Sequence, residues 1–248
     1  MSTQVPNAES AKGTLYLIPT HLSDGAADDT TAVFPPKVVS QALALSHYVA
    51  ENAKTARAFL KSIGATRPLA EISIAEINKH AATINTDQLI QPLLDGHDVG
   101  LVSEAGAPAV ADPGAIVVAA AHAAGVRVVP LVGPSSLLLG LMASGLNGQR
   151  FAFHGYLPQD KSERIRSLQL LEKESRQKQM TQIFIETPYR NAAMFADMIQ
   201  ALSANTSLCV ATDLTGPHEK VTTLPMISWK KINAPIDKLP TLFLFLAR

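Results

Sequence analysis

Three turns of small residues follow apolar runs in this 248-residue chain, and these turns carry its best candidates for ligand binding. They are Pro19-Thr20, the stretch 103–108 within LVSEAGAPAVADPG, and Gly133-Pro134-Ser135-Ser136. Small side chains let a ligand approach the amide N–H and C=O groups closely. If the apolar runs are parallel strands, their carboxyl ends meet at one sheet edge, where ligands bind. The pattern predicts a site built from backbone atoms.

Two carboxylates accompany the second turn. Glu104 can hydrogen-bond an ammonium group or a ribose, or it can be an exposed turn residue. Asp112, followed by Pro113 and Gly114, has the sequence of a helix start with a capping carboxylate. We therefore expect Asp112 to cap a helix, and both interpretations of Glu104 stay open.

Several common chemistries have no motif in the sequence. It contains no GxGxxG fingerprint, Walker loop, HExxH motif or GxSxG elbow. Its seven histidines include no pair at i, i+4, and a single cysteine, Cys209, can form neither a disulfide framework nor a thiolate cage. We expect no metal site and a reducing compartment.

The charge balance and the hydropathy pattern limit which partners and which cell compartment the sequence indicates. Lys plus Arg and Asp plus Glu both number 21, so no global basic field indicates a nucleic-acid partner, although a local patch is compatible with this balance. The amino terminus lacks the pattern of a signal peptide, and the apolar stretch around GPSS is interrupted by that turn. We expect a cytoplasmic protein with no membrane segment.

Apolar runs alternate with amphipathic segments, which predicts a layered α/β fold. We expect a disordered tail over 1–12, an N-terminal α/β domain over 13–148 with a mostly parallel sheet, and a C-terminal α/β domain over 149–248 with a mixed sheet. The boundary is placed at LNGQR, where the composition changes, and 223–238 reads as an antiparallel return. Expected strands are 14–20, 48–50, 98–103, 126–132, 150–158, 181–188, 207–214 and 239–248, and expected helices include 160–179 and 191–203.

SEAGAPAVADPG, GPSS, FHGYLP and IETPYR occur in this order along the chain. Together they resemble the tetrapyrrole methylase superfamily of S-adenosylmethionine-dependent methyltransferases, in the branch related to small-subunit rRNA cytidine 2′-O-ribose methyltransferases. The resemblance runs from Gly13 to about Phe245. It implies a two-domain α/β protein, often a homodimer, that holds S-adenosylmethionine in a cleft between its domains.

The resemblance also implies which residues contact the cofactor. They match the family motifs position by position and come from both halves of the chain. The implied cofactor-binding residues are Pro19, Ser103, Glu104, Ala105, Gly106, Ala109, Ser135, Ser136, Tyr156, Leu157, Thr187 and Pro188.

The cofactor brings its own activated methyl group, so the protein mainly has to align a nucleophile and exclude water. If the acceptor is a ribose hydroxyl, a carboxylate can take its proton; Glu186 is the first candidate and Asp213 the second. Glu186 is equally explained as a structural partner of Arg190, four residues later. Arg164 and Arg190 are candidates for binding an anionic acceptor. Tyr156 can stack on a base or pack inside the protein.

Three departures from the family pattern leave more than one hypothesis about the substrate. PTHLSD stands where TPIGN is usual, TDLTG where RELTK is usual, and the sequence stops short of the carboxyl-terminal extension common in this branch. The leading hypothesis is a methyltransferase of small-subunit rRNA ribose. One alternative is a methyltransferase of a small-molecule or other acceptor. A third, of another class, is a catalytically inactive S-adenosylmethionine-binding regulatory protein.

Overall fold

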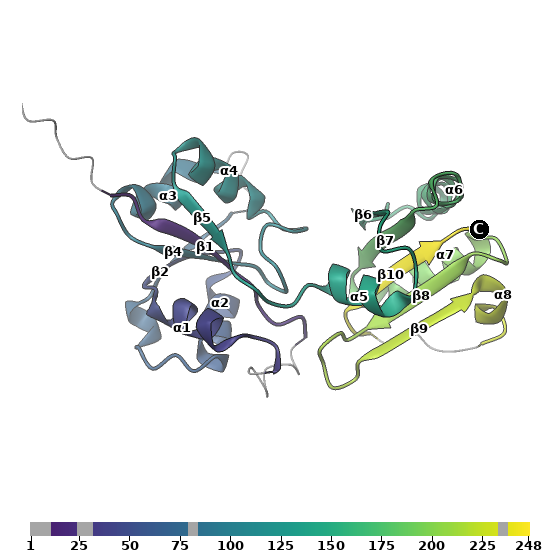
Figure 1. The fold of residues 1–248 in the computed structure, drawn as a ribbon, viewed down its shortest axis with the longest axis horizontal. Coiled ribbons are helices and arrows are strands. Elements are labelled where there is room, and N and C mark those ends of the chain that lie inside the picture. Colours follow the sequence, from purple (N-terminus) through teal and green to yellow (C-terminus); the bar gives the residue numbers. More distant parts are fainter. Residues whose placement is uncertain (1–10, 24–31, 79–83, 233–237) are drawn as a thin grey trace, which may run out of the picture. The chain divides into compact units, whose positions relative to one another are not determined.

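The structure, a computed structural model, describes residues 11–23, 32–78, 84–232 and 238–248 (Figure 1). Its contacts divide the chain into two units. The first unit comprises Met1–His21 and Ala27–Pro134, and the second comprises Leu22–Ala26 and Ser135–Arg248. Each unit is described by itself. Most of the predicted disordered tail, residues 1–10, lies outside the described residues.

The first unit contains a parallel five-stranded sheet of order β3-β2-β4-β1-β5. β4 is buried along its whole length, as predicted for a strand covered on both faces. The sequence pattern does not single out β3, which is a short, half-exposed edge strand. The strands are β1 Thr14–Ile18, β2 His47–Ala50, β3 Ser73–Glu76, β4 Val99–Val102 and β5 Arg127–Pro130.

Helices cover both faces of this sheet, with α1 and α2 on one side and α3 and α4 on the other (Figure 1). Asn52 caps α2, and its side chain accepts hydrogen bonds from the N–H groups of Lys54 and Thr55. Asn85 caps α3, and its side-chain oxygen accepts a hydrogen bond from the N–H of Gln88 at 3.2 Å. The helices are α1 Pro36–Ala44, α2 Ala53–Ser62, α3 Thr86–Leu94 and α4 Ala115–Ala123, with a 3₁₀ turn at Leu69–Glu71.

The second unit contains a mixed five-stranded sheet of order β6-β7-β10-β8-β9. β6 and β7 are parallel, and the remaining neighbours are antiparallel, so the expected mixed sheet is confirmed. Of the antiparallel return expected over 223–238, residues 223–225 end the antiparallel strand β9, 226–229 form a helix, and 233–237 lie outside the described residues. The strands are β6 Phe151–Tyr156, β7 Thr181–Glu186, β8 Ser207–Thr212, β9 Lys220–Pro225 and β10 Thr241–Leu246.

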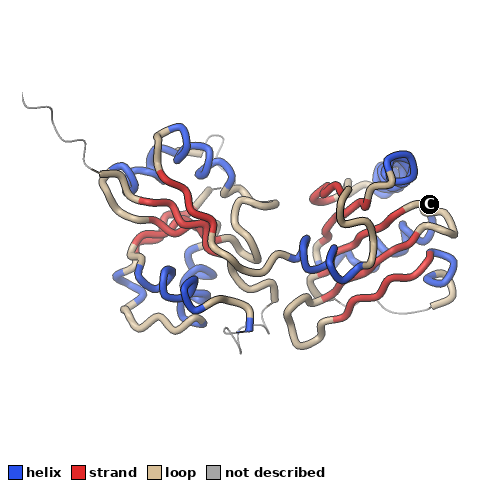
Figure 2. The backbone as a smooth tube through the Cα atoms, viewed as in Figure 1, coloured by secondary structure: helices blue, strands red, loops and turns tan. Residues whose placement is uncertain are grey.

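The helices of the second unit lie on both faces of its sheet (Figure 2). α6, α7 and α8 bury one face of the sheet, where Phe184 and Phe243 lie, and α5 buries the other, where Ile183 and Leu242 lie. This alternation is the period of two expected along a strand. The helices are α5 Ser136–Ser144, α6 Lys161–Lys178, α7 Asn191–Ala201 and α8 Met226–Trp229, with a 3₁₀ turn at Pro188–Arg190.

Helix α5 belongs to the second unit, although the sequence analysis ends the N-terminal domain at residue 148. A Cβ atom on Gly140 would lie 2.3 Å from Leu242 Cδ2, so α5 packs closely on β10. The compositional change at LNGQR instead follows the end of this helix, where Gly145 adopts a left-handed conformation. The contacts therefore divide the chain between Pro134 and Ser135, not between 148 and 149.

Candidate functional site

The structure brings the first-unit parts of the three turns to one sheet edge. β1 pairs with β4 on one side and with β5 on the other, so the carboxyl ends of these strands are neighbours. The N–H of Thr20 donates to Gly106 O at 2.9 Å, and its hydroxyl donates to Ser103 O at 3.2 Å. A Cβ atom on Gly133 would lie 2.4 Å from Pro19 Cβ. The predicted meeting of Pro19, Ser103–Gly106 and Gly133 is confirmed.

The turn after β4 is held in an unusual backbone conformation. Gly106, Ala109 and Ala111 all have positive φ, at 71°, 66° and 61°. The Asp112 carboxylate accepts hydrogen bonds from the N–H of Ala109 at 2.9 and 3.0 Å and of Gly114 at 2.6 Å. The helix-cap prediction for Asp112 is therefore corrected, since Gly114 is the N-cap of α4 and Asp112 closes the turn.

Other groups of this turn remain accessible. Ala105 and Glu104 are exposed, and Ser103 is half-buried with its hydroxyl donating to Gly106 O at 3.0 Å. Glu104 Oε1 accepts a hydrogen bond from Thr55 Oγ1 at 2.7 Å, which ties the turn to the first turn of α2. The exposed part of the turn is therefore Glu104-Ala105, whereas Ser103 O, Ala105 O and the N–H of Ala109 already make hydrogen bonds.

The third turn continues into the second unit. Ser135 is the N-cap residue of α5, and its backbone C=O accepts from Leu139 N at 3.0 Å. Ser136 is the first residue of the helix, and both serines are half-buried.

Buried polar side chains lie at three neighbouring strand ends in the second unit, and hydrogen bonds link those at the ends of β8 and β10. Thr241, at the start of β10, is paired with Glu186 at the end of β7 and with Thr212 at the end of β8. Asn191 Nδ2 donates to Leu239 O at 2.8 Å and to Thr241 Oγ1 at 3.1 Å. The hydroxyls of Thr212 and Thr241 are 3.3 Å apart. Sequence reasoning did not select Asn191, Thr212 or Thr241, although a polar residue at the end of an apolar run is a usable signal.

Glu186 is a buried carboxylate with two nearby donors. Its Oε1 accepts from Thr187 N at 2.7 Å, and its Oε2 lies 3.1 Å from Arg190 Nη2. The side chain of Arg190 is 31% exposed, so this pair joins a buried anion to a cation that reaches the surface. The ion pair with Arg190, one of the two expectations for Glu186, is present.

Asp213 lies in a strained loop after β8. It is buried, with φ 51°, and Thr215 has φ 66°, which is rare for a β-branched residue. Asp213 Oδ2 accepts from His218 N at 2.8 Å, and Asp213 N donates to Pro240 O at 2.8 Å. Its Oδ1 atom is buried and makes no hydrogen bond within the described part of the chain.

The prediction that Arg164 binds a substrate is wrong. Arg164 is buried, and its Nε donates to Asp197 Oδ2 at 2.7 Å. Its Nη1 donates to the backbone oxygens of Pro158 at 3.0 Å and Gln159 at 2.7 Å. The guanidinium therefore fixes the loop after β6 from within the second unit and has no free face for an acceptor.

The remaining predicted residues of the second unit differ in accessibility. Tyr156, at the end of β6, is 59% exposed, whereas Leu157 is buried in the core beside α6 and α7. Thr187 is exposed, and Pro188 is half-buried. Tyr156 is therefore the more accessible of these two predicted cofactor-binding residues.

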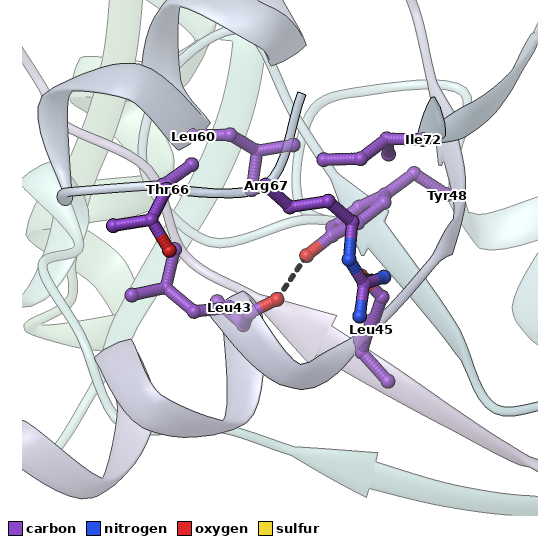
Figure 3. A pocket seen from close by; sticks show the side chains of 9 residues that line it. Leu43, Leu45, Tyr48, Leu60, Thr66, Arg67 and Ile72 are labelled. Atoms are coloured by element: carbon purple, nitrogen blue, oxygen red, sulfur yellow. Dashed lines mark hydrogen bonds between the residues drawn. The ribbon is translucent and has the colours of Figure 1, made fainter. Parts of the chain in front are cut away.

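A cavity of about 140 Å³ lies in the first unit, near the amino end of β2 (Figure 3). Tyr48 donates from its hydroxyl to Ala42 O, and Arg67 Nη1 donates to Leu45 O at 3.4 Å. Burial raises the pKa of Tyr48, so this hydroxyl stays protonated. A cavity of this size holds a benzene-sized molecule, and none of the predicted site residues lines it. It is lined by Ala42, Leu43, Leu45, Tyr48, Leu60, Ala65, Thr66, Arg67 and Ile72.

In the described ranges, no three His, Cys, Asp or Glu side chains are grouped so that they could hold a metal ion. Within the same ranges, none of the helices has the length and apolar character needed to cross a membrane.

The chain is similar to proteins named ribosomal RNA small subunit methyltransferase I. It is 34% identical to the one from Synechocystis sp. over 208 residues, which cover 84% of this chain and 69% of that protein. It is 33% identical to the one from Xylella fastidiosa over 212 residues, covering 86% and 72%. For Escherichia coli O157:H7 the identity is 30% over 231 residues, covering 92% and 76%.

Two solved structures share the fold. A uroporphyrin-III C-methyltransferase from Thermus thermophilus aligns with a TM-score of 0.54 and 16% identity, and the methyltransferase CobJ aligns with 0.58 and 17%. Each alignment covers 95% of this chain and 94% of the other. No model of a protein family matches the chain.

Proposed function

Because the chain belongs to the family of ribosomal RNA small subunit methyltransferase I, within the tetrapyrrole methylase superfamily, we propose that it methylates RNA of the small ribosomal subunit. The methyl donor is S-adenosylmethionine, and the acceptor is a ribose 2′-hydroxyl. The identity of 30% to 34% over most of each relative supports this proposal. The observation that carries it here is the meeting of three small-residue turns at the carboxyl edge of the first sheet.

The residues at this edge fit an adenosyl cofactor. Ala105 presents no bulky side chain, so a flat nucleoside can lie against the backbone of 103–105. The exposed Glu104 carboxylate can accept hydrogen bonds from a ribose or an ammonium group. S-adenosylmethionine supplies an activated methyl group, which leaves the chain to bind, orient and exclude water. The second-unit residues Ser135, Ser136, Tyr156, Thr187 and Pro188 stay predictions within this proposal.

The acceptor hydroxyl has to lose a proton. The two candidate carboxylates, Glu186 and Asp213, differ in the hydrogen bonds and ion pairs that they make. Glu186 Oε1 accepts a hydrogen bond from Thr187 N, and its Oε2 makes none in the described chain but is ion-paired with Arg190 at 3.1 Å. Asp213 has one oxygen with no hydrogen bond in the described chain and sits in a strained loop. We therefore propose that Asp213 accepts the proton, and that Glu186 positions Arg190 to bind a phosphate of the acceptor.

This division of roles predicts different kinetic effects for two isosteric variants. Asp213→Asn should lower kcat by about 10²- to 10⁴-fold, because it removes the base while asparagine tolerates the left-handed backbone. Glu186→Gln should mainly raise KM for the RNA substrate, because Arg190 loses its buried partner. Steady-state methyl transfer to small subunits measures both, and equal losses of kcat in the two variants would contradict the assignment.

The proposed function itself is tested by calorimetric titration with S-adenosylmethionine, followed by transfer of tritiated methyl to small subunits from methylation-deficient cells. We expect binding and a labelled 2′-O-methyl nucleoside after digestion of the RNA. Label in a small-molecule fraction instead would favour the alternative acceptor, which the unusual PTHLSD and TDLTG segments motivate. Binding without transfer to any fraction would favour a regulatory protein, and no binding at millimolar cofactor would end the proposal.

A homodimer and a cytoplasmic location stay predictions of the same proposal. Sedimentation of the full chain measures the first, and fractionation of cells that express it measures the second.

A further inference from the structure

The net charge of the chain is zero because its two halves carry opposite charges that cancel. Residues 1–134 contain 8 Lys and Arg against 12 Asp and Glu, whereas residues 135–248 contain 13 against 9. The two halves therefore carry formal charges of −4 and +4. A polyanion such as RNA is attracted to the second half despite the neutral total.

Burial makes the surface of the second half more basic than its sequence. Four of its carboxylates, Glu172, Glu186, Asp197 and Asp213, are buried, whereas Arg164 is the buried cation among its described Lys and Arg residues. The Glu172 carboxylate, for example, accepts hydrogen bonds from Ser203 and Thr206 inside the unit. Four of the nine carboxylates of this half are therefore withdrawn from the surface, against one of its described cations.

Three exposed cations form a basic stripe along α6, consisting of Arg166, Lys173 and Arg176. At 100° per residue they lie within about 80° of one another around the helix. Glu163 and Glu174 lie on the other flank, and Glu174 is paired with Lys178 at 2.6 Å. No carboxylate of α6 therefore stands between the three cations.

The neighbouring helix does not neutralise this stripe. Arg176 Nη2 lies 3.4 Å from Ser203 Oγ, just after α7, so the stripe borders that helix. The exposed residues of α7 are uncharged: Ala192, Ala193, Ala196 and Gln200. Arg176 Nε also donates to Arg248 O at 3.0 Å, which orders its guanidinium at the surface.

We infer that the basic stripe Arg166–Lys173–Arg176 binds the phosphate backbone of the RNA substrate. This inference rests on the proposed function and adds a surface that holds RNA away from the reacting groups. Along the helix axis the three side chains start about 10 Å and then about 4.5 Å apart, so they form a row of positive charge along one face of the helix. Contacts of this kind fix position and register without reading base sequence.

The test measures binding of a fluorescein-labelled, unstructured single-stranded RNA to the full chain by anisotropy over a range of salt concentrations. For the triple variant Arg166→Gln, Lys173→Gln, Arg176→Gln we expect about tenfold weaker binding, equal for different RNA sequences. The slope of log affinity against log salt should fall by about 2, since each phosphate contact on single strands contributes about 0.7. Methyl transfer to small subunits should show a higher KM with unchanged kcat.

The matched control removes three exposed cations of the first unit, by Lys37→Gln, Lys61→Gln and Arg127→Gln. It changes the net charge equally, and we expect the salt slope of wild type. The charge-preserving variant Arg166→Lys, Lys173→Arg, Arg176→Lys should also keep that slope. Equal losses in the triple variant and the control, or an unchanged slope in the triple variant, would overturn the inference. If wild type binds RNA through the stripe but transfers no methyl group to subunits, the proposed function fails and the binding surface stands.

Discussion

In the first unit the strand ends at the candidate site are joined by main-chain groups, whereas in the second unit they are joined by buried side chains. Thr20 and Gly106 meet through a backbone hydrogen bond, and the turn after β4 relies on positive φ angles. The ends of β8 and β10 meet through the hydroxyls of Thr212 and Thr241, and Asn191 donates to Thr241 as well.

This difference separates two kinds of sensitivity to mutation. A site made of backbone atoms tolerates many side-chain changes but not a Cβ atom where two chain segments touch. A site made of buried polar groups is equally sensitive to an added atom. It is also destabilised when one partner of a hydrogen-bonded or charged pair is removed. Substitutions in the two units therefore test the comparison directly.

The largest effect is expected from Asp197→Ala in the second unit. This variant leaves the buried Arg164 guanidinium without its carboxylate, and the loss of one partner of a buried ion pair costs about 3–5 kcal/mol. Denaturant unfolding followed by the fluorescence of Trp229, the single tryptophan, measures it. Glu174→Ala, which breaks the more exposed pair with Lys178, is the control and should cost about 0.5 kcal/mol. Similar costs for both variants would contradict a second unit that depends on buried pairs.

A smaller effect is expected from Gly133→Ala in the first unit. The new Cβ atom would meet Pro19 Cβ at 2.4 Å, so the turns after β1 and β5 must separate, at a cost of about 1–3 kcal/mol. Binding of S-adenosylmethionine should weaken as well, which titration calorimetry measures. Gly148→Ala, where a Cβ atom meets nothing within 4 Å, should leave both quantities unchanged. Unaltered stability and cofactor affinity in Gly133→Ala would show that this contact is not needed.

The smallest effect is a pH dependence confined to the first unit. Burial lowers the pKa of His21, whose Nδ1 has no hydrogen-bond partner in the described chain and whose ring packs on Phe34. The unfolded chain then binds more protons than the folded one, so this contribution to stability is present above the ordinary histidine pKa of about 6.5 and is lost as pH falls below it. Burial and His97 lower the pKa of His47 as well, with the same sign.

Far-UV circular dichroism reports both units, and Trp229 fluorescence reports the second alone. Between about pH 7.5 and 5.5 the dichroism midpoint in denaturant should therefore fall more than the fluorescence midpoint. His21→Gln should reduce the difference between the two midpoint shifts. Part of the difference should remain in this variant, because His47 still titrates in the first unit. Parallel shifts of the two midpoints in wild type would contradict a pH dependence confined to the first unit.

Local patterns predicted the layers of the fold and the meeting of the turns. The alternation of strands and helices follows from residue periodicity, and the helix expected over 160–179 occurs as α6 with Asp160 and Gln179 as its caps. The strand-ending turns are equally local, because glycine and proline determine where a chain can bend. The order of strands around β1 then brings these turns to one edge.

Features that depend on distant partners could not be predicted from these patterns. Arg164 lies in a charged helix, and its sequence context predicts a surface residue. Its burial depends on Asp197, which is 33 positions away in the sequence and accepts its hydrogen bond. The assignment of α5 to the second unit depends on the contact between Gly140 and Leu242, which no local composition shows. Asp112 was placed on a helix start, but its carboxylate bonds backward to Ala109.

Each sheet has a chain-terminal strand in its interior: β1 lies between β4 and β5, and β10 lies between β7 and β8. During synthesis β1 stays unpaired until residues 99–102 and 127–130 have left the ribosome, and the second sheet cannot close before its last strand emerges. Such distant pairings slow folding, because a long loop must close before they form. Partly synthesised chains of this protein therefore expose unpaired strand edges, and we expect them to aggregate more readily than the finished chain.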